Sequence, residues 1–243
     1  MKIIFSPTKK MKRNREDKAV PFEYPDTTNA IIDALKSLDE KEVQKLFKIS
    51  NSLLIETMAY LADLGYGPYT PALFSYEGIQ YQYLDPSSLD EGSLDYLAKR
   101  MYIVSALYGL LHIYDGIEPY RLDLENPLKV NGCRTLYELW GDALYKELYK
   151  DGDTVINLCS EEYSKIITRF LKPGDRFIDI VFYEKEGNSY KEKGVYCKMA
   201  RGMFLRYMAE HKIDSVEGLK LFAAAGYRYQ EGMSSKNKLV FAR

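Results

Sequence analysis

The pattern of hydrophobic and polar positions predicts short buried strands near both ends of the chain and helices between them. The apolar run at 2–5 predicts the first strand, which Ser6-Pro7 ends before a basic polar loop over 8–18. Apolar residues every three or four positions, with capping-box pairs at Asp39/Glu42 and Ser88/Glu91, predict helices. The predicted helices span 39–48, 50–64, 89–112, 135–149, 161–171 and 198–212, of which 89–112 is the longest.

The other segments predict strands and loops. Residues 154–160 predict a strand, and the alternating segments 177–184 and 188–198 predict a β-hairpin around Gly187-Asn188. Short strands are predicted over 220–230 and 238–242, and a loop with one short strand over 67–84. The N-terminal strand needs partners, and the other predicted strands lie mostly near the C-terminus. We therefore expect one α+β domain over 1–243, in which helices surround a mixed sheet.

The helix predicted over 198–212 has two different faces. Its apolar face is predicted to pack on the sheet and carries Met199, Ala200, Met203, Phe204, Tyr207 and Met208. Lys198, Arg201 and Arg206 lie on the other face, with Gly202 among them. This basic face is either simply solvated or turned toward a bound polyanion.

Charge is unevenly distributed along a chain whose net charge is only -1. Basic residues dominate over 1–20, 190–212 and 228–243, whereas 77–95 carries five acids and no base. Such segregation either creates a local positive field or neutralises itself in the fold. Three scattered cysteines predict no disulfide framework and a reducing compartment, and no apolar run is long enough to span a bilayer. We expect a cytoplasmic protein that does not bind membranes.

Several chemistries have no motif in the sequence. The sequence contains two histidines, His112 and His211, and no Cys or carboxylate cluster has metal-ligand spacing. The glycine-rich loops of ATP and dinucleotide sites are missing, as is the G-x-S-x-G motif of hydrolases. We therefore expect no metal site and no cofactor.

Two polar motifs follow predicted strands. FSPTKKM places Ser6, Lys9 and Lys10 after the first strand, and INLCSEEYSK places Asn157, Ser160 and Lys165 at a strand–loop–helix corner. A helix N-terminus of this kind suits an anion, although Ser160 can equally be an ordinary helix cap. Both corners can line one cleft if both strands belong to one sheet.

A third motif, ALYGLLHIYDGIEPYRLD at 106–123, predicts a helix followed by a tight turn at 115–119. Backbone N–H groups in such a turn can contact a phosphate, with Arg121 as the supporting charge. Alternatively, Arg121 forms a salt bridge with Glu118 or Asp123, which lie close in sequence.

Six motifs, in this order and spacing, resemble the YaaA family of bacterial peroxide-stress proteins: SPTKKM, LYGLLHIYDGIEPYRLD, LYELWGD, INLCSEEYSK, KMARGMFLRYM and FAAAGYRY. The resemblance extends from Ile4 to Phe241. It implies a single α+β domain with a positively charged cleft and a helix-hairpin-helix-like element, which falls here on 107–121. Helix-hairpin-helix turns are usually rich in glycine, whereas this turn contains only Gly116.

The resemblance also implies a role. Family members are similar to proteins that bind duplex or distorted DNA, and they protect cells from hydrogen peroxide by keeping unincorporated iron low and limiting DNA damage. The candidate DNA-phosphate contacts are Lys9, Lys10, Arg121, Lys165, Lys198 and Arg201. We expect largely sequence-independent DNA binding, without enzymatic activity, in an oligomeric state that the sequence leaves open.

Two alternatives remain. The protein can be an enzyme that modifies or removes a nucleobase, in a small polar pocket where an aromatic ring stacks on the base. The candidate pocket residues are Ser6, Tyr108, Tyr120, Trp140, Asn157, Ser160 and Tyr163, with Lys198 nearby. The protein can also bind iron directly, although it offers few ligands.

Overall fold

A mixed β-sheet runs through the computed structural model, which describes residues 1–13, 19–67 and 69–243. Its strand order in the described chain is β4-β3-β1-β6-β7-β10-β9, and β8 pairs with β7 outside this path. Neighbours among β3, β1, β6, β7 and β10 are parallel, whereas β4, β9 and β8 pair antiparallel. The strands are β1 Lys2–Phe5, β3 Met101–Ser105, β4 Gly109–Leu111, β6 Val155–Leu158, β7 Phe177–Glu186, β8 Ser189–Lys191, β9 Arg228–Tyr229 and β10 Lys238–Ala242. A separate small pair joins β2 Thr70–Pro71 to β5 Gly116–Ile117.

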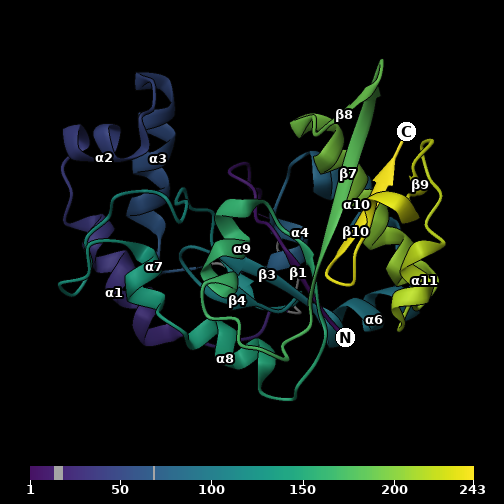
Figure 1. Cartoon of the computed structure of the whole chain (residues 1–243). Coiled ribbons are helices and arrows are strands. Elements are labelled where there is room, and N and C mark those ends of the chain that lie inside the picture. The colour runs from purple at the N-terminus through teal and green to yellow at the C-terminus, as the bar shows by residue number, and fades with distance from the viewer. Residues whose placement is uncertain (14–18, 68) are drawn as a thin grey trace.

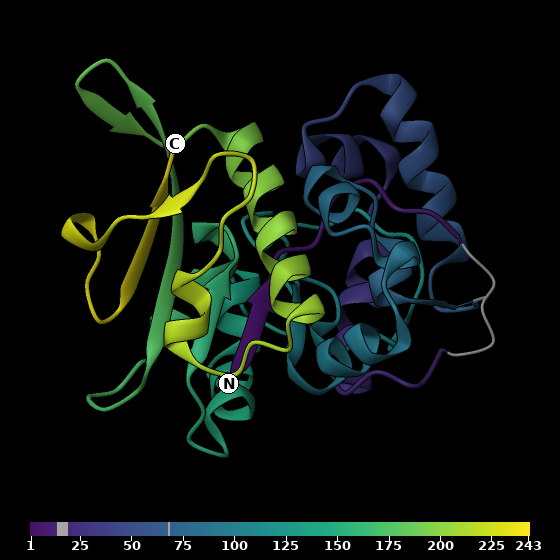
Figure 2. The same ribbon diagram turned by 90° about the vertical axis from the view of Figure 1, so that its right-hand side faces the viewer.

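Helices flank this sheet. Figure 1 places α1, α2 and α3 on one side of the molecule and α10 and α11 on the other. Figure 2 shows α10 between the C-terminal part of the sheet and the helices of the N-terminal half, and α10 contacts both β7 and α5. The helices are α1 Pro25–Lys36, α2 Glu40–Phe47, α3 Asn51–Asp63, α4 Ala72–Ser75, α5 Ile79–Leu84, α6 Glu91–Arg100, α7 Leu136–Trp140, α8 Ala143–Tyr149, α9 Glu161–Thr168, α10 Gly194–Glu210 and α11 Val216–Lys220, with the 3-10 helices η1 Pro86–Ser88 and η2 Glu231–Met233.

The predicted fold class is confirmed, because one mixed sheet with flanking helices joins both halves of the chain. β1 lies between β3 and β6 and is buried along its whole length. Even Lys2 is buried, and its Nζ donates to the carbonyl oxygen of Leu148 at 3.0 Å. A central parallel strand is covered on both faces, which explains its continuous apolar sequence.

The prediction of one long helix over 89–112 is wrong. The helix α6 ends at Arg100, and the chain continues directly into β3 and then β4. All five residues of β3 are buried, and such a fully buried apolar run has no polar positions to show a two-residue period. The three- and four-residue spacing beyond Arg100 therefore did not reflect a helix.

The predicted helix-hairpin-helix-like element at 107–121 is also wrong. Its first part is β4, its turn leads into β5, and no helix is formed over these described residues. Gly109 has a φ of 76°, and a Cβ there would lie 2.9 Å from the Trp140 ring. The positive φ and the close ring both require glycine at the β3–β4 turn.

Smaller corrections concern the other predicted elements. The helix predicted over 135–149 is divided at Gly141, whose φ is 51°, and the hairpin's second strand ends at Lys191 before α10 begins. Most of 220–230 is not strand, since only β9 pairs there. The structure adds α1, α4, α5 and α11, which were not predicted. The end of the predicted basic loop, 14–18, lies outside the described residues.

The turn between β4 and β5 contains a buried carboxylate, Asp115. The His112 backbone N–H donates to its Oδ2 at 2.8 Å, and Asp115 is 4% exposed. Burial raises the pKa of Asp115 to about 6, although the hydrogen bond from His112 acts in the opposite direction.

We expect Asp115→Asn to remove a pH dependence of stability. The folded protein retains the Asp115 proton up to about pH 6, whereas the unfolded chain releases it near 3.8. The stabilisation from this group is therefore complete below about pH 4 and is lost as pH rises through 6. At pH 8 the variant should be about 2 kcal/mol more stable than the wild type. Urea unfolding from pH 4 to 8 measures this, and parallel curves for the two proteins would contradict it.

Candidate functional site

Ser6 lies directly after β1, at the carboxyl end of the parallel strands. The Ser160 backbone N–H donates to Ser6 Oγ at 2.9 Å, so the ends of β1 and β6 are joined. The Ser6 carbonyl oxygen accepts hydrogen bonds from Gln80 Nε2 and, at 3.1 Å, from the Tyr81 hydroxyl. The predicted meeting of the two strand-end motifs is confirmed for Ser6 and Ser160.

Asn157 holds the end of β6 in shape. Its Nδ2 donates to Asp179 Oδ1 on β7 at 2.7 Å, and its Oδ1 accepts from the Cys159 backbone N–H at 2.8 Å. The nitrogen and the oxygen of the Asn157 amide are therefore both hydrogen-bonded within the protein. Asn157 is a structural support of this corner, which we call the β1/β6 corner: Ser6, Asn157, Cys159 and Ser160.

Cys159 is a buried thiol in the β1/β6 corner. Burial raises its pKa to about 12, and the hydrogen bond from Ser6 and the charge of Arg201 only partly offset this effect. The group is a neutral thiol at neutral pH, so it adds no negative charge to the corner.

The corner lies where the order in which the chain adds strands to the sheet reverses. The chain passes from β1 to β3 on one side, and the later strands β6, β7 and β10 follow on the other side of β1. Ligands of open α/β sheets bind outside the carboxyl ends of the strands at such a point. The position of the corner is therefore favourable for a ligand.

The candidate cations near the N-terminus are largely neutralised. Lys9 Nζ lies 2.6 Å from Asp123 Oδ2, and the Tyr163 hydroxyl donates to the other oxygen of Asp123 at 3.0 Å. Lys10 Nζ lies 3.1 Å from Glu77. Tyr163 is thus committed to Asp123, and Lys9 and Lys10 each have a carboxylate partner.

A hollow of about 180 Å³ lies beside Lys10. Its charged lining consists of Lys10, Lys12, Glu77 and Asp85, two cations and two anions. This hollow carries no excess of positive charge, so it is not the positively charged cleft that the resemblance implied.

Three aromatic candidates belong to the core. Trp140 is 3% exposed and its Nε1–H donates to the Ala106 carbonyl at 3.0 Å. The hydroxyl of Tyr120 lies 2.7 Å from Ser105 Oγ, and the Tyr108 hydroxyl accepts from the Glu118 N–H at 3.2 Å. Their polar tips are hydrogen-bonded inside the protein, so these three side chains serve the packing of the core.

A basic and aromatic surface surrounds the C-terminal end of α9. Lys165 Nζ lies 5.6 Å from the centre of the Tyr137 ring, and the Arg169 guanidinium lies 5.5 Å from the Phe170 ring. Lys172 Nζ lies 5.7 Å from the Tyr145 ring. We call Lys165, Arg169 and Lys172 the α9 basic surface; among the described residues none of the three forms an ion pair. Of these only Lys165 was a candidate, although the spacing of four and three residues could have indicated the others.

Two further candidate cations are Arg121 and Lys198. Arg121 lies near α3. Its charge and that of Arg13 lower the pKa of Tyr60 on this helix, although burial raises that pKa by more. Lys198 is exposed on α10. That all six candidate cations contact phosphates on one surface stays a prediction.

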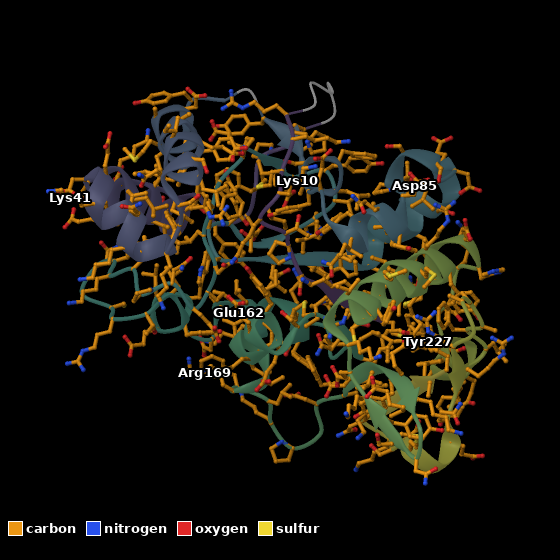
Figure 3. The ribbon with its side chains drawn as sticks, turned by 90° about the horizontal axis from the view of Figure 1, so that it is seen from above. Lys10, Lys41, Asp85, Glu162, Arg169 and Tyr227 are labelled. Carbon is orange, nitrogen blue, oxygen red and sulfur yellow. The ribbon has the colours of Figure 1, made fainter. Side chains whose placement is uncertain are left out.

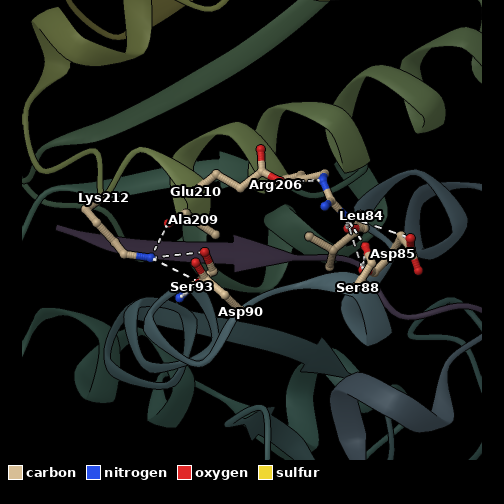
Figure 4. Close-up of polar contacts among 9 residues, drawn as sticks. All are labelled: Leu84, Asp85, Ser88, Asp90, Ser93, Arg206, Ala209, Glu210 and Lys212. Atoms are coloured by element: carbon tan, nitrogen blue, oxygen red, sulfur yellow. Dashed lines mark hydrogen bonds and ion pairs between the residues drawn. The ribbon is translucent and has the colours of Figure 1, made fainter.

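Arg201 differs from the other cations. Its Nε is buried and has no hydrogen-bond partner among the described residues. The basic face of α10 is not a free surface either, since Gly202 lies against α5 and Arg206 bonds to residues after it (Figure 4). The interpretation that the basic face of this helix is simply solvated is therefore wrong for Gly202 and Arg206, whereas Lys198 is exposed.

Comparison with known proteins identifies the family. The family model described as "Peroxide stress protein YaaA" matches residues 1–233. The chain belongs to the YaaA family. A UPF0246 protein of Lachnoclostridium phytofermentans is 39% identical over 246 residues, covering 100% of this chain and 96% of the relative. A UPF0246 protein of Limosilactobacillus reuteri is 40% identical, covering 99% and 98%.

The YaaA family description indicates a role in peroxide stress, whereas the relatives' names state no ligand or reaction. In the described residues no group of three or more His, Cys, Asp or Glu side chains is placed to hold a metal ion. No helix within the described ranges is long and apolar enough to cross a membrane.

Proposed function

We propose that this YaaA-family protein binds DNA with little sequence preference during hydrogen peroxide stress, and so limits DNA damage and unincorporated iron. The α9 basic surface is the observation that carries this proposal. Its cations have no carboxylate partner among the described residues, unlike Lys9 and Lys10. Unpaired cations can neutralise phosphates and release the counterions that surround DNA.

Aromatic rings strengthen the case for this surface. The Tyr137 hydroxyl donates to the Glu162 carbonyl at 2.8 Å, which fixes the ring beneath Lys165 and Arg169. A fixed ring restricts the cation above it, so less side-chain entropy is lost when that cation contacts a phosphate. Basic residues interleaved with rings are typical of surfaces that bind nucleic acid without reading its sequence.

We expect the triple variant Lys165→Ala/Arg169→Ala/Lys172→Ala to bind DNA at least tenfold more weakly at about 0.15 M salt. Each lost phosphate contact should also reduce the slope of log affinity against log salt by about 0.9. Fluorescence anisotropy with short duplex, single-stranded and bulged DNA at several salt concentrations measures both quantities and identifies the preferred DNA shape.

A charge-matched variant controls for the altered net charge. Lys41→Ala/Lys45→Ala/Lys48→Ala removes three exposed lysines, of which two lie on α2 and Lys48 directly follows it. Figure 3 shows Lys41 well apart from Arg169. Cations near the C-terminal end of α9 also stabilise the helix dipole, so unfolding is measured for all proteins. Equal loss of affinity in both triple variants, or no binding by the wild type at low salt, would refute the proposal.

The β1/β6 corner favours a second candidate, an enzyme that modifies or removes a nucleobase. Ser6 and Ser160 meet there, at the position where α/β sheets bind ligands. Incubation with a broad panel of DNAs containing damaged or modified bases tests this activity. Absence of any released or altered base across the panel would refute it.

A further inference from the structure

Arg201 has an unsatisfied polar atom inside the protein. Its Nε is the single buried side-chain nitrogen or oxygen without a hydrogen-bond partner in the described part of the chain. A guanidinium is always charged, and leaving one of its donors buried without a partner is costly. Native proteins rarely contain such an atom unless a ligand, ion or water completes the site.

Two observations place the part of α10 that carries Arg201 near the β1/β6 corner. The positive charge of Arg201 acts on the Cys159 thiol, which lies at the end of β6. The next residue, Gly202, packs against the Gln80 backbone, and the Gln80 side chain donates to the Ser6 carbonyl. The turn of α10 that contains Arg201 and Gly202 therefore lies close to the corner.

The corner contains further donors of the kind that bind anions. Ser160 precedes α9, and its side chain makes no capping hydrogen bond, so the first N–H groups of α9 are not satisfied by it. Ser6 Oγ accepts from the Ser160 N–H and its hydroxyl hydrogen-bonds to the Cys159 thiol, so Ser6 holds the corner together while the Ser160 hydroxyl stays available as a donor. The neighbouring Asp179 carboxylate is not a donor; it accepts a hydrogen bond from the Asn157 amide within the protein.

We propose that Arg201, with the Ser160 hydroxyl and the first N–H groups of α9, binds the phosphate or carboxylate group of a small molecule at the carboxyl ends of β1 and β6. The guanidinium supplies a planar, charged donor, and Ser160 with the first N–H groups of α9 supplies neutral donors. The bound oxyanion satisfies the buried Nε and neutralises its charge. This site is separate from the α9 basic surface, and it does not depend on DNA binding.

The test measures binding of inorganic phosphate, acetate and nucleoside monophosphates by calorimetry and by thermal unfolding, at constant ionic strength. We expect saturable binding of at least one probe by the wild-type protein and at least tenfold weaker binding by Arg201→Met. The Met variant keeps an unbranched apolar side chain in place of the arginine stem and removes the charge and the donors. Comparison of the probes distinguishes a phosphate site from a carboxylate site.

Arg206→Met is the matched control, because Arg206 lies on the same helix but is fully engaged. It bonds to the Leu84 carbonyl at 3.0 Å, to Ser88 Oγ at 2.8 Å and to Glu210 at 2.8 Å (Figure 4). This variant should lose stability and keep the probe affinity. Arg201→Lys, which keeps the charge, provides a second test should the Met variant fail to fold, and it should also bind more weakly.

Two results would overturn the proposal. One is the absence of saturable binding of every probe by the wild type. The other is equal probe affinity in the wild type and both Arg201 variants. Arg169→Ala should leave probe affinity unchanged while weakening DNA binding, so failure of the DNA proposal can be distinguished from failure of this one.

Discussion

Gly202→Ala should destabilise the protein by about 3 kcal/mol, because α10 and α5 approach too closely for a methyl group. A Cβ at this position would lie 2.2 Å from the Gln80 carbonyl oxygen and 2.9 Å from Tyr83 Cβ. The first of these atoms belongs to the backbone, so it cannot rotate away. The two helices must separate, although alanine is intrinsically the better helix former. Urea unfolding of the two proteins measures the loss.

Gly194→Ala is the matched control within the same helix. A Cβ at Gly194 would meet nothing within 4 Å, so this variant should be neutral or slightly stabilising. Equal effects of the two substitutions would show that helix propensity, and not the contact with α5, determines the result. Separation of α10 from α5 should also displace Arg201 from the β1/β6 corner and weaken any bound oxyanion.

Local patterns predicted those elements that begin or end at a clear polar boundary. The α2 helix begins at the predicted capping box, in which Asp39 accepts from the Glu42 N–H and Glu42 accepts in return. The strands β1 and β6 were predicted from short apolar runs bounded by polar residues, and their polar ends indicated the β1/β6 corner. In each case the information is contained in a few consecutive residues.

The failures have a common physical cause, which is burial by distant parts of the chain. β3 is covered on all sides, so its sequence could be read as a continuation of α6. Gly202 was assigned to the basic face of α10 and not to a packed one, because its partner Gln80 is more than a hundred residues away. The partners of Lys9 and Lys10, Asp123 and Glu77, are equally remote in sequence, so net charge by segment overestimated the positive field.

Glu118 illustrates the same point, because its role could not be read from its neighbours. It was considered as a partner of Arg121, but its carboxylate instead accepts hydrogen bonds from the backbone N–H groups of three residues after α3. The distances are 2.6 Å to Gly65, 3.1 Å to Tyr66 and 2.5 Å to Gly67. Gly65 and Gly67 have positive φ angles, and successive N–H groups in such a turn converge on an anion.

We expect Glu118→Ala to lower the free energy of unfolding by about 3 kcal/mol or more, since three hydrogen bonds to a charged, buried group are lost. Glu118 is 3% exposed, so removing its side chain also leaves a cavity beside β5. Glu118→Gln keeps the volume but turns an amide N–H₂ toward a backbone N–H, and it should cost about 2 kcal/mol. The exposed Glu125→Gln controls for the loss of one negative charge and should change stability by less than about 0.5 kcal/mol. If the two Glu118 variants lose no more stability than this control, water replaces the carboxylate at the loop. The loop after α3 then does not depend on Glu118.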